Sequence, residues 1–114
     1  MNENPVLEKS YAFALSIVEF YKQSAEDKYD KPLSKQLLRS GTSIGANITE
    51  AQNAQSTADF KSKMNIALKE ARESEYWTRL LHDTHYMSDE VFTALQPKLK
   101  EILKLLTSIV KNTK

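Results

Sequence analysis

The chain has 114 residues, enough for one domain, and a formal charge of only +1 at pH 7, so no global field drives it to nucleic acid or membrane. Two glycines and three prolines are too few for the turns of a β-sandwich or barrel, and the lack of cysteine excludes a disulfide framework, a thiolate zinc site and a cysteine nucleophile. No apolar run approaches the roughly 20 residues of a membrane span, and the polar, acidic start is unlike a signal peptide, which predicts a cytoplasmic protein.

The first helix is predicted to begin at Asn4 and Pro5, because asparagine caps helices and proline suits the first helical position. Its apolar side chains form two adjacent rows that together cover roughly 180°, against about 100° for a surface helix on one core. The second of these rows consists of Leu7, Tyr11, Ala14, Val18 and Tyr21. We therefore expect this helix to contact something outside its own bundle.

A second helix is predicted to begin at Pro32 or Ser34 and to carry Gly41 and Gly45 on its apolar side. Each glycine inside a helix costs about 1 kcal/mol relative to alanine, so the pair predicts that another backbone comes close. The glycines do not indicate a phosphate-binding loop, because the Gly-Lys-Ser/Thr ending of that motif is missing.

Ser56 and Asp59 resemble a capping box at the start of a third helix, expected to run from about Thr57 to Thr84. Apolar residues surround this helix almost completely, which is typical of a helix buried on several sides. Its water-facing charges are expected to be Lys69, Arg72, Arg79 and Asp83.

Ser88 is the predicted cap of a fourth helix, whose apolar spacing of three and four residues continues across Pro97. We expect one helix with a kink rather than two helices. Four helices with short connections predict an all-α fold with one domain over residues 1–114, an antiparallel up-down-up-down four-helix bundle with a kinked fourth helix.

Metal chemistry is not indicated by the pattern. A di-metal carboxylate site in a helix bundle needs Glu-x-x-His motifs, and this sequence has none. His82 and His85 can share one side of a helix end, but two ligands do not complete a zinc site, so we expect two partly exposed side chains. We assign no catalytic residue, metal or cofactor and expect the protein not to be an enzyme.

A set of polar residues falls on or beside the apolar sides of the second and third helices. Buried carboxylates must be paired or hydrogen-bonded, so we expect a structural network completed by Arg39, a tyrosine hydroxyl or a neighbouring subunit. The set comprises Ser43, Asn47, Glu50, Glu70 and Glu73. No nucleophile–base pair accompanies them, which argues against catalysis.

Two basic stripes are the candidates for binding a polyanion. One follows four-residue steps on the second helix, and the other lies opposite the apolar side of the fourth helix. Such stripes can neutralise phosphates without reading bases, but an ordinary solvated helix has the same pattern, and both interpretations stay open. The stripes are Lys31, Lys35 and Arg39 on the second helix, and Lys100, Lys104 and Lys111 on the fourth.

The segment from Gln36 to Ala51, with its core Ser-Ile-Gly-Ala-Asn-Ile-Thr-Glu, resembles the four-helix-bundle family of 23S rRNA intervening-sequence proteins. Asp59-Phe60 and the segment from Ile66 to Trp77 carry the same resemblance, and the fold is similar to the diversity-generating retroelement accessory protein. The resemblance implies a ring-shaped homopentamer with no known enzymatic activity, and for the retroelement relatives it implies binding of nucleic acid and a reverse transcriptase.

We therefore expect a homo-oligomer, a pentamer by the family resemblance, that is a nucleic-acid-associated scaffold for RNA or DNA. The alternative is a protein-interaction adaptor that binds no nucleic acid. The wide apolar arc of the first helix and the nearly all-round apolar third helix favour self-association independently of the resemblance.

Overall fold

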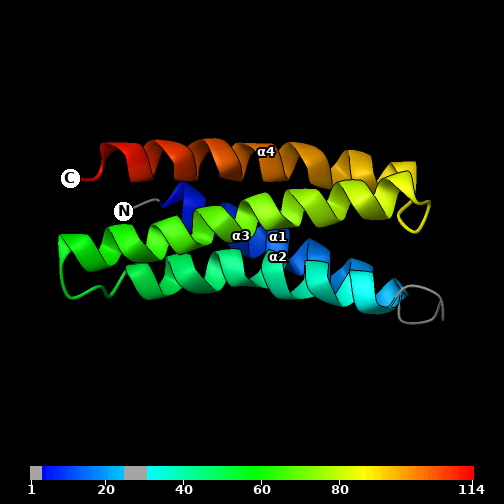
Figure 1. Cartoon of the computed structure of the whole chain (residues 1–114), viewed down its shortest axis with the longest axis horizontal. Helices are drawn as coiled ribbons and strands as arrows, with labels where there is room; N and C mark the ends of the chain where they lie inside the picture. Colours follow the sequence, from blue (N-terminus) through cyan, green and yellow to red (C-terminus); the bar gives the residue numbers. More distant parts are fainter. Residues whose placement is uncertain (1–3, 25–30) are drawn as a thin grey trace.

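The computed structural model describes residues 4–24 and 31–114, which form four α-helices. They are α1 (Pro5–Ser24), α2 (Lys31–Ala51), α3 (Thr57–Asp83) and α4 (Asp89–Asn112). The chain runs from left to right along α1 and α3 in Figure 1 and from right to left along α2 and α4, in a rod of 45 × 25 × 21 Å. The prediction of an all-α helix bundle is confirmed.

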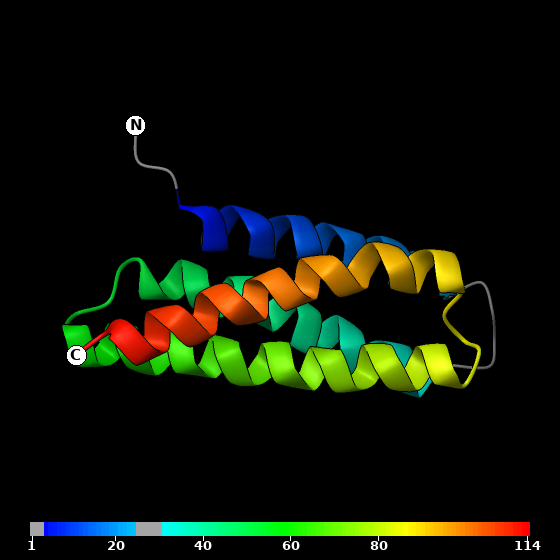
Figure 2. The ribbon, with the colours of Figure 1, turned by 90° about the horizontal axis from the view of Figure 1, so that it is seen from above.

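The helices stand at the corners of a square in chain order. Each helix lies beside the next one and α4 lies beside α1, whereas no Cα atoms of α1 and α3, or of α2 and α4, come within 8 Å of each other in these described helices. Figure 2 shows α4 crossing the bundle obliquely, near α1 at its beginning and nearer α3 at its end. The α1–α2 edge and the α3–α4 edge therefore lie on opposite sides of the molecule.

Apolar side chains from every helix fill the space inside this square. Phe13 and Ile17 of α1, Ile44 of α2, Leu81 of α3 and Ile102 of α4 are all fully buried. Packing of this core, more than intrinsic helix propensity, stabilises helices of such length in water. No helix in the described ranges combines the length and the apolar character needed to cross a lipid bilayer.

Capping side chains begin three of the helices as predicted. Asn4 Oδ1 accepts a hydrogen bond from a backbone N–H in the first turn of α1, and Ser88 Oγ does the same for α4. At α3, Ser56 Oγ accepts from the backbone N–H of Asp59 at 3.0 Å, while Asp59 Oδ2 accepts from the backbone N–H of Gln55 at 3.1 Å. The Ser56 half of the capping box is thus present, whereas the Asp59 carboxylate accepts from the residue before the cap rather than from the N–H of Ser56 itself.

Two predicted boundaries need small corrections. α2 begins at Lys31, before the predicted Pro32, and α3 ends at Asp83 with Thr84 as its C-cap. α4 continues through Pro97 as one helix, as predicted, because proline removes a single backbone hydrogen bond from an otherwise continuous pattern. The kink at Pro97 stays a prediction.

The two glycines of α2 face α1 at close range. A Cβ atom at Gly45 would lie 3.4 Å from Ser10 Oγ and 3.5 Å from the Ser10 carbonyl oxygen, so the backbone of α1 does come near this position. At Gly41 the nearest atom is instead in a side chain, Ile17 Cγ1, at 3.0 Å. The predicted approach of another backbone is therefore present at Gly45, whereas at Gly41 the nearest atoms belong to a side chain.

Candidate functional site

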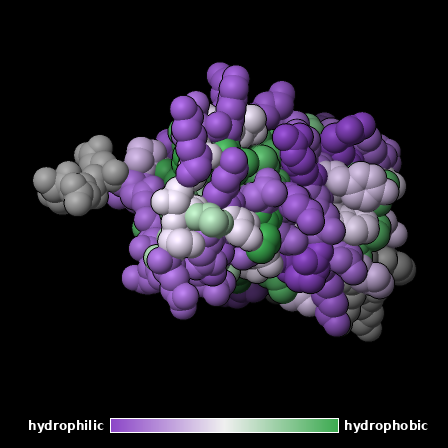
Figure 3. Space-filling view, turned by 60° about the vertical axis from the view of Figure 1, so that its left-hand side comes forward, coloured by the Kyte–Doolittle hydropathy of each residue, from purple (hydrophilic) through white to green (hydrophobic). Residues whose placement is uncertain are grey.

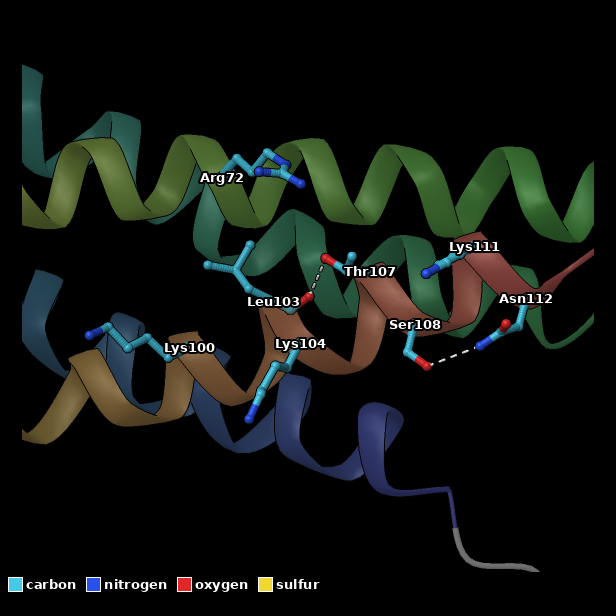
Figure 4. A pocket seen from close by; sticks show the side chains of 8 residues that line it. All are labelled: Arg72, Lys100, Leu103, Lys104, Thr107, Ser108, Lys111 and Asn112. Carbon is cyan, nitrogen blue, oxygen red and sulfur yellow. Dashed lines mark hydrogen bonds between the residues drawn. The ribbon is translucent and has the colours of Figure 1, made fainter.

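A shallow basic groove of about 710 Å³ runs along the outer seam between α3 and α4, and we call it the α3–α4 groove (Figure 4). Its lining residues are Arg72, Lys100, Leu103, Lys104, Thr107, Ser108, Lys111 and Asn112. This lining contains cations and neutral residues and no carboxylate. The groove therefore presents positive charge to solvent at neutral pH.

The fourth-helix stripe that the sequence predicted forms one wall of this groove. Lys100, Lys104 and Lys111 follow one another along α4, and Arg72 faces them from α3 (Figure 4). Lys104 points away from α3 in Figure 4, whereas Lys111 lies on the side of α4 next to α3. Within residues 4–24 and 31–114, none of these four cations has a carboxylate within ion-pair distance, so all can meet an anionic ligand.

The neutral polar residues of the groove are held within α4. Thr107 Oγ1 donates to the Leu103 carbonyl oxygen at 2.7 Å, and Asn112 Nδ2 donates to Ser108 Oγ at 3.2 Å. Both contacts are drawn in Figure 4. These hydrogen bonds restrain the neutral side chains of the lining, and the cations supply its charge.

The second-helix stripe does not join the groove, because α2 and α4 are diagonal in the square. Lys31 begins α2, but its side chain lies outside the described residues, and Lys35 is exposed. Arg39 is engaged by α3, since its Nη1 donates to Glu70 Oε2 at 3.2 Å and its Nη2 pairs with Glu73. Three of the six predicted cations thus line the groove together with Arg72, whereas Arg39 pairs with carboxylates of α3.

The predicted polar network has two separate parts. Arg39 bridges to Glu70 and Glu73, which are partly exposed rather than buried. On α2 itself, Ser43 Oγ donates to the Arg39 carbonyl oxygen at 2.6 Å, and Asn47 Nδ2 donates to the Ser43 carbonyl oxygen at 2.8 Å. Glu50 is exposed and makes no side-chain contact with the others in the described ranges.

A buried hydroxyl pair between α2 and α3 was missed by the sequence reasoning. Ser74 Oγ lies 2.9 Å from Ser40 Oγ, and both residues are fully buried. Thr78 Oγ1 continues this line by donating to the Ser74 carbonyl oxygen at 2.7 Å. The available signal was the four-residue spacing of Ser74 and Thr78 inside the apolar arc of α3. Small hydroxyl side chains can be buried there because each can donate its hydrogen bond to a carbonyl oxygen of its own helix.

The two histidines lie where α3 meets α4. The His82 ring stacks on Phe92, with ring centroids 4.0 Å apart, and its Nε2 lies 2.6 Å from Asp89 Oδ1. His85 is exposed. No group of three or more histidine, aspartate or glutamate side chains in residues 4–24 and 31–114 could hold a metal ion.

An apolar row covers the outward side of α1. Tyr11 is 66% exposed and Leu15 is 56% exposed, and Val18 continues the row. Beside it, a hollow of about 260 Å³ lies between α1 and α2 and is lined on α2 by Thr42, Gly45, Ala46 and Thr49. Figure 3, which looks obliquely onto another side of the molecule, is mainly hydrophilic with small apolar patches.

The structure defines a small helical-bundle protein with two distinct surfaces. One is the basic groove on the α3–α4 edge, and the other is the apolar row on the opposite edge. The family model of the 23S rRNA-intervening sequence protein matches residues 2–108, and the chain belongs to this family. The resemblance seen in the second and third helices is therefore confirmed.

A solved crystal structure is similar over nearly the whole chain. It is a protein with unknown function from the S23 ribosomal protein family of Bacteroides thetaiotaomicron, 52% identical, with a TM-score of 0.89. The match covers 94% of this chain and 99% of that one. A comparison with curated proteins finds no match.

Proposed function

We propose that this protein is a non-enzymatic, homo-oligomeric scaffold of the cytoplasm that binds the phosphate backbone of RNA or DNA through its α3–α4 groove. The observation that carries the proposal is the set of four cations, Arg72, Lys100, Lys104 and Lys111, that line one groove without a carboxylate. Phosphate contacts of this kind supply affinity and position but no sequence readout.

The weak net charge of the chain does not oppose this function. The charge is +1 over all 114 residues, but some acidic side chains outside the groove are paired across the bundle, as Glu101 is with Lys9 and Glu70 with Arg39. Local potential at a groove, rather than net charge, governs the binding of a polyanion at a Debye length of about 8 Å in physiological salt. Several copies of one modest site acting together raise the overall affinity.

Self-association through the α1–α2 edge is the second part of the proposal. The outward row of Tyr11, Leu15 and Val18 stands beside the hollow over Gly45 and Ala46, so a ridge and a receiving surface lie next to each other on one face. A ridge that enters the hollow of the next copy makes a head-to-tail contact, and such contacts form a ring when the rotation between neighbouring copies closes. The family resemblance favours a pentamer, and the opposite α3–α4 edge stays open to ligand in such an assembly.

Nucleic-acid binding is tested by fluorescence anisotropy with a labelled RNA at several salt concentrations. We expect affinity to fall steeply between about 50 and 200 mM salt, and the slope of log K against log salt to decrease by roughly one for each cation removed. Lys104→Ala is the informative variant, and Lys35→Ala, on the diagonal helix, is the matched control. No binding at low salt, or equal losses in both variants, overturns the proposal.

Self-association is tested by light scattering at micromolar concentration. Leu15→Glu places a charge in the apolar row and is expected to lower the measured mass toward that of one chain, whereas Thr93→Glu on the exposed side of α4 is the control. A wild-type mass equal to one chain contradicts the assembly.

The alternative function, a protein-interaction adaptor, uses the same exposed row on α1. It predicts capture of a partner that survives nuclease treatment and is lost in Leu15→Glu, together with no RNA binding by the wild type. The two functions are therefore separated by nuclease sensitivity and by the dependence of binding on Lys104.

A further inference from the structure

Basic side chains continue from the α3–α4 groove onto the outer surface of α3. Lys61, Lys69, Arg72 and Arg79 are exposed, and their spacing returns to one side of the helix over about 27 Å of its length. Within the described ranges none of them has an ion-pair partner. Arg72 belongs to both this stripe and the groove, so the two basic surfaces meet at this residue.

An aromatic ring lies between two of these cations on α3. Tyr76 stands about one helical turn from Arg72 on one side and from Arg79 on the other, and it is 58% exposed. Its ring meets Trp77 edge-on, with centroids 5.0 Å apart and planes at 75°. Trp77 packs against the core, so this contact restrains Tyr76 while leaving most of it open to solvent.

An exposed aromatic ring flanked by unpaired cations has a specific use with nucleic acid. Phosphates of either a single strand or a duplex can contact the cations. A base can stack on a protein side chain only when its face is free, and in a duplex that face is covered by the neighbouring bases. A positively charged track combined with an aromatic platform is the arrangement by which proteins hold single strands without sequence preference.

We propose, on the basis of the proposed nucleic-acid function, that the ligand of this surface is single-stranded nucleic acid and that Tyr76 is the residue on which one of its bases stacks. Arg72 and Arg79 then hold the phosphates on either side of that base, and the α4 lysines hold the continuing backbone. Glu75 lies directly beside Tyr76, about one helical turn from both Arg72 and Arg79, and Asp83 lies one turn beyond Arg79. These two carboxylates border the stacking position, and the cations Lys69 and Lys61 continue from Arg72 toward the beginning of α3.

The test compares a labelled oligouridylate of about 15 nucleotides with an RNA duplex of equal length, by anisotropy at low salt. We expect the wild type to bind the single strand more tightly than the duplex. Tyr76→Ala should weaken single-strand binding by about 5- to 100-fold and leave duplex binding and the salt slope unchanged, because it removes a stacking surface and no charge. Tyr76→Phe, which keeps the ring, should bind like the wild type.

Tyr86→Ala is the matched control, because Tyr86 is also exposed but lies in the α3–α4 connection near Asp83 and Asp89. It should bind both ligands like the wild type, and circular dichroism melting should show all three variants folded. Equal single-strand affinity for Tyr76→Ala and wild type, or tighter binding of duplex by the wild type, overturns the stacking role while leaving the proposed phosphate binding intact. Absence of binding to either ligand removes both proposals.

Discussion

Arg39 of α2 donates a hydrogen bond to Glu70 of α3 at 3.2 Å, across the seam between the two helices. The same guanidinium pairs with Glu73, so a residue that the sequence places in a basic stripe serves the bundle instead. The Arg39 side chain is 51% exposed, and pairs of such exposure contribute at most about 1 kcal/mol.

Arg39→Ala should therefore lower the free energy of unfolding by up to about 1 kcal/mol in urea denaturation. It should leave the salt slope of RNA binding unchanged, since the guanidinium is already neutralised by carboxylates. Lys104→Ala should do the reverse, with unchanged stability and a smaller slope. A slope reduced by about one in Arg39→Ala means that the arginine meets phosphate after all.

The two glycines of α2 should respond oppositely to alanine. At Gly45 a Cβ atom has only ordinary contacts with Ser10, so Gly45→Ala should gain up to about 1 kcal/mol of helix propensity. At Gly41 the Cβ atom would press on Ile17, a fully buried and β-branched side chain that has little freedom to move, so Gly41→Ala should be less stable than the wild type. Urea denaturation measures both, and a shift of the same sign in the two variants refutes the packing argument.

Local features could be predicted from the sequence, because their partners are close along the chain. Ser56 and its hydrogen-bond donor Asp59 are three positions apart, and the lysines of the groove lie on one helix, so local spacing is enough to align them. The residues that other helices contribute to a site depend on how the helices are rotated and crossed, and the pattern of one helix does not contain this information. For that reason the sequence did not predict that Arg72 lines the groove or that Arg39 pairs with Glu70.

The same limit explains the buried hydroxyls. Ser40 and Ser74 are far apart in sequence and meet only because α2 and α3 pack closely, and neither carries a charge that demands a partner. The exposed apolar surface at Tyr11 and Val18 of α1, by contrast, follows from the predicted width of the apolar arc, because the width of an arc on one helix is a local property. Leu15, which is also exposed, lay outside the two predicted rows.

Stability should fall in acid partly through Asp59. A hydrogen bond from Lys63, at 2.6 Å, and a second one from the Gln55 backbone lower the pKa of this carboxyl from its ordinary value. A carboxyl with a depressed pKa stabilises the fold above its ordinary pKa, and the contribution is lost as pH falls through the lowered value.

The difference in unfolding free energy between wild type and Asp59→Asn should therefore be constant near neutrality and shrink below about pH 4. Urea denaturation across that range measures it, and Asp83→Asn, an exposed carboxyl at the other end of α3, is the control. Ordinary carboxyls have a pKa of roughly 4, so the unfolded chain takes up protons in this range. A difference in unfolding free energy that stays the same down to about pH 3 contradicts the role of the capping carboxylate.

The end of α3 offers a position where the present residue is unfavourable. His85 has a φ of 69°, and its backbone N–H donates to the His82 carbonyl oxygen while the N–H of Tyr86 donates to that of Leu81. These two bonds form a Schellman motif, in which glycine is preferred at the left-handed position because a Cβ atom there costs about 1 kcal/mol or more.

His85→Gly should raise the free energy of unfolding by up to about 1 kcal/mol, reduced by the larger freedom of glycine in the unfolded chain. Thr84→Gly is the control, because Thr84 has a φ of −94° and its hydroxyl donates to the Leu80 carbonyl oxygen at 2.6 Å. Glycine at 84 should therefore lower stability, while glycine at 85 should raise it, in thermal or urea denaturation. If His85→Gly melts at a lower temperature than the wild type, the imidazole contributes more stability than the backbone strain removes. The prediction from the positive φ of His85 is then wrong.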